Sequence, residues 1–206
     1  MITIHLVRHG ETIWNKSGKY QGSTDVPLSS KGIEQAEKLA NYMKNTPITA
    51  VYSSNLIRAK VTAEQIARCH GLPVKTFAEL QELCFGEWEG LTFDEIEARW
   101  PGVVEQMYTK PSEVQIENGE TFADMQTRAF SCLQSILKQH KDGDTIVLVC
   151  HGGTNRVLLC ALLNLPLDFS WSVRQDNTAV STVWYNGTRN YLALLNSTIH
   201  LTGEYV

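Results

Sequence analysis

The feature that most constrains the fold is a mostly apolar and β-branched run at residues 2–7, which ends directly at Arg8, His9 and Gly10. Such a run is typical of a buried strand, and the glycine lets the chain turn after it. In open α/β sheets, ligands bind at the carboxyl edge of the strands. A cation and an imidazole at this edge therefore indicate a ligand site, although a lone histidine there would equally fit a structural role.

The rest of the chain alternates strand and helix patterns. Further strands are expected at residues 48–52, 74–77 and 145–150. Amphipathic helices are expected at residues 33–43, 57–71, 121–140 and 155–163. Residues 179–185 and 191–195 are expected to form a hairpin around Asn186-Gly187. This alternation predicts an α/β fold with a largely parallel sheet.

Residues 91–120 interrupt the alternation. Two short helices are expected there, one at residues 93–100 that Pro101 stops, and one that ends near Lys110. The segment is interpreted as an inserted helical lid, so residues 1–206 are expected to form a single domain.

Composition excludes several classes of protein. The net charge is −4 and no basic stripe is present, so a nucleic-acid partner is not expected. The five cysteines form no C-x-x-C pair and are odd in number, which favours reduced thiols. No signal-peptide pattern and no apolar run of about 18 residues is found, so no membrane span is expected and the protein is expected to be cytoplasmic.

Polar groups follow three of the expected strands. They are Arg8-His9, then Ser53 with Arg58 one helical turn later, and His151-Gly152. Parallel strands present their carboxyl ends at one edge, so two arginines and two histidines should converge there. Guanidinium forks match oxyanions, and the helix that opens at Gly152 offers free N–H groups to an anion. The pattern predicts a phosphate site.

A metal site is the competing interpretation, since His9 and His151 are both possible ligands. A dication beside two guanidinium groups is electrostatically unfavourable, and the chain has no H-E-x-x-H motif. A G-x-x-x-x-G-K-[ST] nucleotide loop is also missing from the sequence. No metal or cofactor is therefore expected.

A bound phosphoryl group suggests a covalent mechanism. His9, in the turn beside Arg8, is the better candidate for the nucleophile, and His151 for a donor to the phosphoryl oxygens. A carboxyl group must protonate the leaving alkoxide and later activate water. Glu82, after the third strand, is the preferred candidate. Spacing alone leaves three competitors open, which are Glu11, Glu79 and Glu87.

The motifs resemble the signature of the histidine phosphatase superfamily, which includes cofactor-dependent phosphoglycerate mutases. The resemblance rests on 6–12 (Leu-Val-Arg-His-Gly-Glu-Thr), Trp14-Asn15, Gln21-Gly22, Pro27-Leu28-Ser29, Gly32, Gln35-Ala36, Val51-Tyr52-Ser53-Ser54, Arg58-Ala59, Glu82, Phe85-Gly86, Trp88-Glu89-Gly90, Gly119-Glu120-Thr121, Arg128 and Val149-Cys150-His151-Gly152-Gly153. It covers the whole chain. Residues 119–121 read Gly-Glu-Thr where Gly-Glu-Ser is usual, and either hydroxyl can cap the following helix.

The resemblance implies a three-layer α/β/α sandwich with a mostly parallel sheet and a small helical lid. It implies that His9 is phosphorylated and that Glu82 donates the proton. It also implies that Arg8, Arg58 and His151 complete the phosphate pocket. Further residues expected at the site are Asn15, Gln21, Gly22 and Gly152. The expected activity is metal-independent hydrolysis of a small phosphomonoester.

The charge of the lid segment favours a phosphatase over a mutase. It holds seven acids against two bases, Arg99 and Lys110. The acids are Asp94, Glu95, Glu97, Glu105, Glu113, Glu117 and Glu120. An acidic lid does not suit a small, highly anionic substrate, so net phosphatase activity is expected. A phosphoglycerate mutase, or a non-catalytic module that binds phosphoproteins, remains the alternative.

Residues 88–101 and 195–201 resemble the branch that holds α-ribazole phosphatases and broad-specificity phosphatases. α-Ribazole 5′-phosphate is the substrate of first choice, because a lid rich in aromatic residues could stack on its ring. These lid residues are Phe93, Trp100, Met107 and Tyr108. Phosphoserine, whose ammonium suits an acidic lid, is the alternative. His200 in the tail and a homodimer that pairs C-terminal strands are left open.

Overall fold

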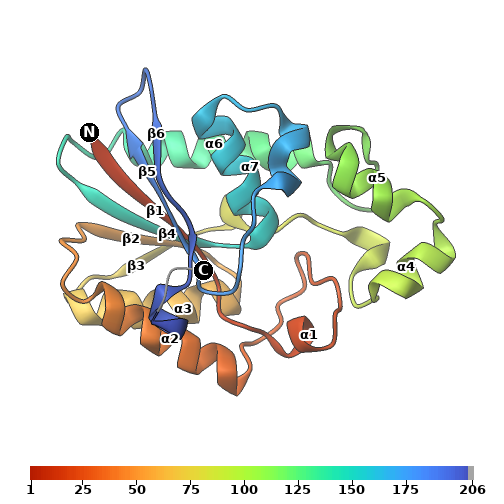
Figure 1. The fold of residues 1–206 in the computed structure, drawn as a ribbon, viewed down its shortest axis with the longest axis horizontal. Helices are drawn as coiled ribbons and strands as arrows, with labels where there is room; N and C mark the ends of the chain where they lie inside the picture. Colours follow the sequence, from red (N-terminus) through yellow and green to blue (C-terminus); the bar gives the residue numbers. More distant parts are fainter. Residues whose placement is uncertain (204–206) are drawn as a thin grey trace.

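The computed structural model describes residues 1–203, which contain one six-stranded sheet in the order β3-β2-β4-β1-β5-β6 (Figure 1). The strands are β1 (Ile2–Arg8), β2 (Ala50–Ser54), β3 (Val74–Phe77), β4 (Thr145–Cys150), β5 (Val180–Tyr185) and β6 (Tyr191–Ser197). Strands β3, β2, β4 and β1 are parallel neighbours, β5 runs antiparallel to β1, and β6 pairs antiparallel with β5 as a hairpin. The sheet is mostly parallel, as the sequence predicts.

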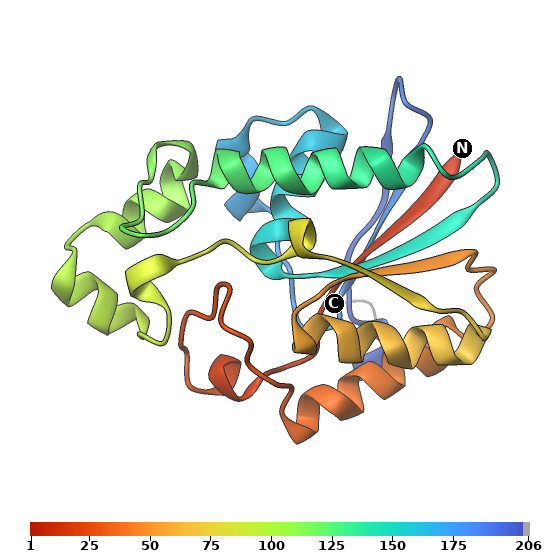
Figure 2. The same cartoon turned by 180° about the vertical axis from the view of Figure 1, so that it is seen from behind.

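Helices cover both faces of this sheet (Figures 1 and 2). Helices α2 (Ser30–Met43) and α3 (Ile57–His70) bury one apolar cluster against one face, with Leu39 and Ile66 fully inside. Helices α6 (Phe122–Leu137) and α7 (Gly152–Leu163) bury a second cluster on the other face, around Leu133 and Leu158. The three-layer α/β/α prediction is confirmed.

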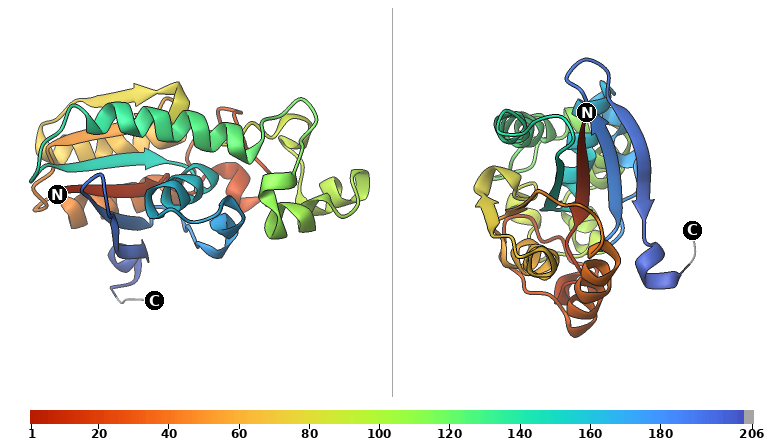
Figure 3. Two further views of the ribbon diagram at one scale, coloured as in Figure 1. Left: turned by 90° about the horizontal axis from the view of Figure 1, so that it is seen from above. Right: turned by 90° about the vertical axis from the view of Figure 1, so that its left-hand side faces the viewer.

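Residues 1–203 contain four further α-helices, all short, which are α1 (Ile13–Lys16), α4 (Phe93–Arg99), α5 (Val103–Thr109) and α8 (Ile199–Thr202). Four 3₁₀ helices complete this part of the chain, at Ala78–Leu80, Gly86–Trp88, Pro111–Glu113 and Leu167–Ser172. Helices α4 and α5 extend beyond one end of the sheet (Figure 3). They close over a third apolar cluster that includes Ile96, Met107, Phe122 and Val157. The lid segment is thus packed on the first turns of α6 and α7. Within residues 1–203, no helix is both long enough and apolar enough to cross a bilayer.

The element boundaries differ from the sequence prediction in several places, including the start of α2, which is three residues earlier, and the end of α6, which is three residues earlier than expected. Helix α7 begins at Gly152, three residues earlier than expected. Gly152 and Gly153 adopt helical backbone there, and the Gly153 N–H donates to the Glu82 carboxylate, which lies outside the helix. Strand β2 starts and ends two residues later than expected. Helix α1 was not expected, since its four residues carry no periodic pattern. A capping box between Thr12 and Asn15 holds it instead.

The first strand places the chemistry-bearing residues at the carboxyl edge of the sheet. Arg8 pairs in register with Cys150, and Ser53 pairs with Val149, so the three polar strand exits meet there. The turn after β1 also packs closely on α2. A Cβ at Gly10 would lie 2.4 Å from the Gly32 carbonyl oxygen, which requires glycine at that position.

Candidate active site

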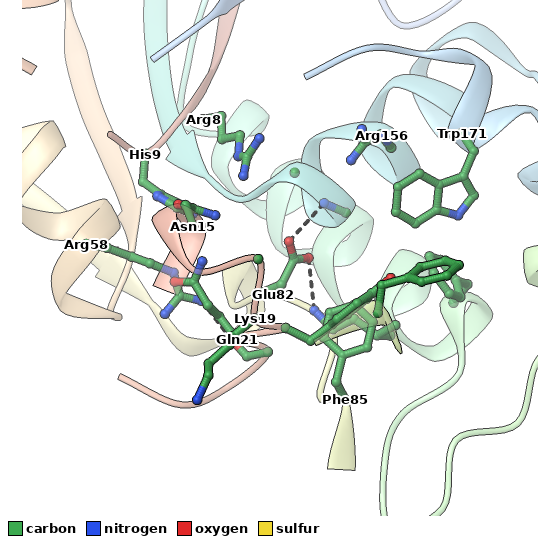
Figure 4. A pocket seen from close by; sticks show the side chains of 18 of the residues that line it. Arg8, His9, Asn15, Lys19, Gln21, Arg58, Glu82, Phe85, Arg156 and Trp171 are labelled. Carbon is green, nitrogen blue, oxygen red and sulfur yellow. Dashed lines mark hydrogen bonds between the residues drawn. The ribbon is translucent and has the colours of Figure 1, made fainter. Parts of the chain in front are cut away.

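A cavity of about 370 Å³ opens at the carboxyl edge of the sheet, below the lid (Figure 4). It is lined by Arg8, His9, Asn15, Gly18, Lys19, Tyr20, Gln21, Gly22, Arg58, Glu82, Leu83, Phe85, Phe93, Tyr108, Phe122, Gly152, Gly153, Arg156 and Trp171. Eight of the nine site residues expected from the sequence are among them. The ninth, His151, is fully buried just behind the wall, with its ring centroid 5.2 Å from that of His9.

The hydrogen bond of His9 fixes its tautomer. His9 Nδ1 lies 2.7 Å from the carbonyl oxygen of Gly10, which can only accept. Nδ1 therefore carries the proton, and Nε2 keeps a free lone pair. The backbone around it is held as well, since Asn177 donates its side-chain amide to the His9 carbonyl. His9 is thus oriented as a nucleophile requires.

His151 is held in the opposite tautomer. Arg58 Nε donates to His151 Nδ1 at 3.2 Å, so the proton of this imidazole sits on Nε2. The same guanidinium donates to the carbonyl oxygens of Thr24 and Gly22, at 2.8 and 2.7 Å. Arg58 is 1% exposed and fixed at three points. This network makes His151 a hydrogen-bond donor.

Both imidazoles are neutral at pH 7. Burial, followed by the charges of Arg58 and Arg8, lowers the pKa of His9 well below its ordinary value. Burial, Arg58, His9 and Arg8 lower the pKa of His151 in the same way. Burial also lowers the pKa of Arg58 to about 10, which leaves the guanidinium charged at neutral pH. The site therefore pairs cationic guanidinium groups with uncharged rings.

Two buried donors at this site have no hydrogen-bond partner among residues 1–203. They are Arg8 Nε and His151 Nε2. Unpaired buried donors are costly, and an anion bound between them would satisfy both. Arg8 is anchored from its other side, where Nη1 donates to the Gln175 carbonyl oxygen at 2.7 Å. The arrangement fits a phosphoryl group better than a neutral ligand.

The Glu82 carboxylate caps helix α7. The N-cap residue, His151, makes no capping bond with its side chain. Instead, Glu82 Oε2 accepts the Gly153 N–H at 2.9 Å (Figure 4), and Oε1 accepts the Thr154 N–H at 3.1 Å. A Cβ at Gly153 would lie 2.5 Å from Oε1, so this close approach requires glycine. The helix end thus aims the carboxyl group at the cavity.

Arg128, on α6, fixes the loop that carries Glu82. Its Nη1 donates to the carbonyl oxygens of Glu79 and Gln81, and its Nη2 to that of Glu82, at 2.7–3.0 Å. Its remaining N–H groups hold both carboxylate oxygens of Glu120, at 2.6 and 2.7 Å. All five guanidinium donors are used, so the backbone of the loop is rigidly placed.

The three competing carboxylates do not line the cavity. Glu11 pairs with Lys31 at 2.9 Å. Glu87 accepts from the side chain of Asn118, and Glu79 lines a separate cavity. Within residues 1–203, Glu82 is the one carboxylate on the cavity wall.

Asn15 and Gln21 offer amide donors to the cavity. The side-chain oxygen of Asn15 accepts from the Thr12 N–H at 3.0 Å, and that of Gln21 accepts from the Thr12 hydroxyl at 2.9 Å. Because Thr12 donates to the oxygen of each side-chain amide, the orientation of both amide groups is fixed. The two NH₂ groups make no hydrogen bond with Thr12. The cavity therefore has polar donors on the side of α1 as well.

Sequence reasoning missed two cations, Lys19 and Arg156, and the indole of Trp171. Arg156 lies one helical turn after Gly152 on the same face of α7, a spacing that could have revealed it. Trp171 lies in a 3₁₀ helix (Leu167–Ser172), and the sequence around it carries no strand or helix pattern. With Arg8 and Arg58, four basic side chains and one carboxylate line the cavity.

The interpretation that an acidic lid faces the substrate is wrong. Of residues 91–120, only Phe93 and Tyr108 line the cavity. The carboxylates are used elsewhere: Glu95 caps α4, Glu97 accepts the Gly102 N–H, and Glu120 holds Arg128. The net charge of the lid sequence therefore differs from the charge that the lid presents to the cavity.

Three other expected residues lie away from the cavity. Trp100 packs on Trp88, with ring centroids 6.4 Å apart, and Met107 is fully buried in the lid cluster. His200 lies outside the cavity, with its Nε2 2.9 Å from the Thr178 hydroxyl and its ring centroid 6.0 Å from that of Tyr42. Nowhere in residues 1–203 do three or more His, Cys, Asp or Glu side chains gather as metal ligands would.

Comparison with known proteins identifies relatives over almost the full length. The model of the histidine phosphatase superfamily (branch 1) matches residues 4–198. Phosphoserine phosphatase 1 of Hydrogenobacter thermophilus is 34% identical over 206 residues, which are 100% of this chain and 97% of the relative. A probable phosphoglycerate mutase GpmB of Yersinia pestis is 36% identical over 188 residues, 90% of this chain and 86% of the relative.

Solved structures share the fold. YhfR of Bacillus stearothermophilus aligns with a TM-score of 0.90 and 33% identity, over 97% of this chain and 99% of that one. The α-ribazole phosphatase of Shigella flexneri aligns with a TM-score of 0.84 and 29% identity, over 95% and 96% of the two chains. The phosphoglycerate mutase-like fold expected from the sequence is confirmed.

The two tautomers can be read by nuclear magnetic resonance. We expect ¹⁵N spectra of the side chains to show His9 protonated on Nδ1 and His151 on Nε2. Because burial and two guanidinium groups disfavour the charged rings, neither should titrate between about pH 8 and pH 6. Reversed tautomers, or titration of either ring near its ordinary value, would contradict this account of the site.

Proposed function

Because the chain belongs to the histidine phosphatase superfamily, we propose that it hydrolyses small organic phosphate monoesters through a phosphohistidine formed on His9. The observation that carries the proposal is the tautomer of His9. The Gly10 carbonyl holds the proton on Nδ1 and leaves Nε2 as a free nucleophile at the cavity wall. No metal or cofactor enters the proposed steps.

In the first step, His9 Nε2 attacks phosphorus and the ester P–O bond breaks. Arg8, Arg58 and the Nε2–H of His151 stabilise charge on the phosphoryl oxygens, helped by the free amide donors of Asn15 and Gln21. Gly22 and Gly152 also line the cavity, and because they have no side chains they leave room for the phosphoryl group. The leaving oxygen takes a proton from Glu82.

In the second step, water replaces the alcohol. Glu82, now ionised, takes a proton from the water, whose oxygen attacks phosphorus. The P–N bond breaks, which releases inorganic phosphate and restores the Nε2 lone pair of His9. The imidazole carries positive charge while it is phosphorylated, and its Nδ1–H bond to the Gly10 carbonyl oxygen stabilises that charge. One carboxyl group thus serves both half-reactions.

Two substrates have support within this activity. α-Ribazole 5′-phosphate, the first choice from the sequence, is supported by Phe93 and Tyr108, which are 47% and 45% exposed where they line the cavity. Phosphoserine is supported by the relative from Hydrogenobacter thermophilus. Phosphoglycerate mutase activity stays an alternative, because the acids of the lid do not line the cavity and four basic side chains do.

The activity is tested by phosphate release in the presence of EDTA. p-Nitrophenyl phosphate, α-ribazole 5′-phosphate, phosphoserine and 3-phosphoglycerate would be compared. We expect EDTA-resistant release that His9→Ala abolishes and that His70→Ala, on the far end of α3, leaves intact. Full activity of His9→Ala would contradict the proposed nucleophile. Interconversion of 3- and 2-phosphoglycerate that requires a bisphosphate would favour a mutase, and binding without turnover a binding module.

The role of Glu82 predicts a dependence on the leaving group. An alkoxide needs a proton to depart and p-nitrophenolate does not, so Glu82→Gln should slow an alkyl phosphate by about 10²- to 10⁴-fold and p-nitrophenyl phosphate far less. Glu79→Gln is the matched control, since Glu79 lies on the same loop but is exposed and outside the cavity. An equal loss on both substrates would show that Glu82 is not the acid.

A further inference from the structure

Arg156 is a rigidly held guanidinium group whose outer edge has no protein partner. Its Nε donates to the carbonyl oxygen of Val173 at 2.9 Å. Its Cζ lies 4.4 Å from the ring centroid of Trp171, on which the guanidinium stacks. Neither Nη nitrogen donates a hydrogen bond, or forms an ion pair, with any group in residues 1–203. Two fixed contacts thus aim a free two-donor edge into the cavity.

The charge of Arg156 is only partly offset by the carboxylates of Glu82 and Asp176, neither of which forms an ion pair with it. Burial, together with the nearby charge of Arg8, lowers its pKa to about 10, so the group stays cationic at neutral pH. The neighbouring carboxylate, Glu82, is occupied by the N–H groups of α7. A partly buried cation without a counter-ion is costly unless a ligand supplies one. A ligand at this site is therefore expected to carry a second anionic group besides its phosphoryl group.

The position of Arg156 limits the size of the substrate. A Cβ at Gly152 would lie 3.0 Å from Arg156 Nη1 and 3.6 Å from Arg8 Nε, so the two guanidinium groups flank this one glycine. A ligand that reaches both must carry its two anionic groups only a few bonds apart. The free edge of Arg156 presents two parallel N–H groups, which match the two oxygens of a carboxylate.

We infer that Arg156 determines specificity by binding a carboxylate on a short, aliphatic phosphate ester whose phosphoryl group lies at His9. The inference rests on the proposed phosphatase activity and narrows its substrate class. Phosphorylated hydroxy acids and amino acids such as 3-phosphoglycerate and phosphoserine carry such a carboxylate, separated from the phosphate-bearing carbon by a single carbon. α-Ribazole 5′-phosphate has no second anion, so it would leave Arg156 unpaired.

The test uses pairs of substrates that differ at the carboxylate. Phosphoserine is compared with phosphoethanolamine, and 3-phosphoglycerate with glycerol 3-phosphate. A charge-assisted contact predicts that kcat/KM favours the carboxylated member by about 10- to 100-fold. Arg156→Gln should bring this ratio close to one, mainly through KM, and Arg156→Lys should give a ratio in between. Arg68→Gln, an exposed arginine on α3, is the control that should leave the ratio unchanged.

Two results would overturn the inference. One is a wild-type enzyme that shows no preference for the carboxylated member of either pair. The other is an equal loss on both members in Arg156→Gln, which would place Arg156 on the phosphoryl oxygens instead. Calorimetric binding of the same pairs to His9→Ala measures the preference without turnover. Failure of catalysis alone would then count against the phosphatase proposal and not against the carboxylate site.

Discussion

The candidate active site depends on burying guanidinium groups beside imidazoles that must remain uncharged. Protonating both imidazoles would bury two further cations at this edge of the sheet, at a high cost in free energy. Burial and Arg58 together therefore keep His9 and His151 neutral. A neutral His9 has a lone pair to share, and a neutral His151 has exactly one ring proton to donate. The backbone carbonyl of Gly10 and the Nε–H of Arg58 then decide which nitrogen carries each proton. The electrostatics of burial and the geometry of two hydrogen bonds thus assign the roles of both rings.

The same edge uses its one carboxylate for two purposes. Glu82 caps helix α7 and partly offsets the positive charge of Arg8, Arg58 and Arg156. A dianionic phosphoryl group would take over that second role when it binds, which frees Glu82 to exchange protons with the leaving group and with water. In the proposed mechanism Arg128 holds the loop in place during this exchange, because three of its donors bind the carbonyl oxygens of Glu79, Gln81 and Glu82.

The parts of this site that the sequence predicts are those that lie at strand ends. Buried strands reveal themselves by continuous apolar runs, and parallel pairing then forces Arg8, His9, Arg58 and His151 to one edge. This reasoning does not predict Arg156 or Trp171, because Arg156 lies inside α7 and Trp171 lies in a short 3₁₀ helix, and neither is at a strand end. The lid shows the opposite failure. Its acidic composition is real, but side-chain direction depends on packing against α6 and α7, which the sequence pattern does not show.

The central claim is that the phosphoryl group passes through Nε2 of His9. The most direct measurement is to mix the enzyme with p-nitrophenyl phosphate labelled in its phosphoryl group and to quench during the first turnover with alkali, in which phosphohistidine survives. The labelled peptide is then located by mass spectrometry. The account predicts label on His9, lost on further incubation as inorganic phosphate is released. Turnover with no labelled protein, or label on another residue, would contradict it.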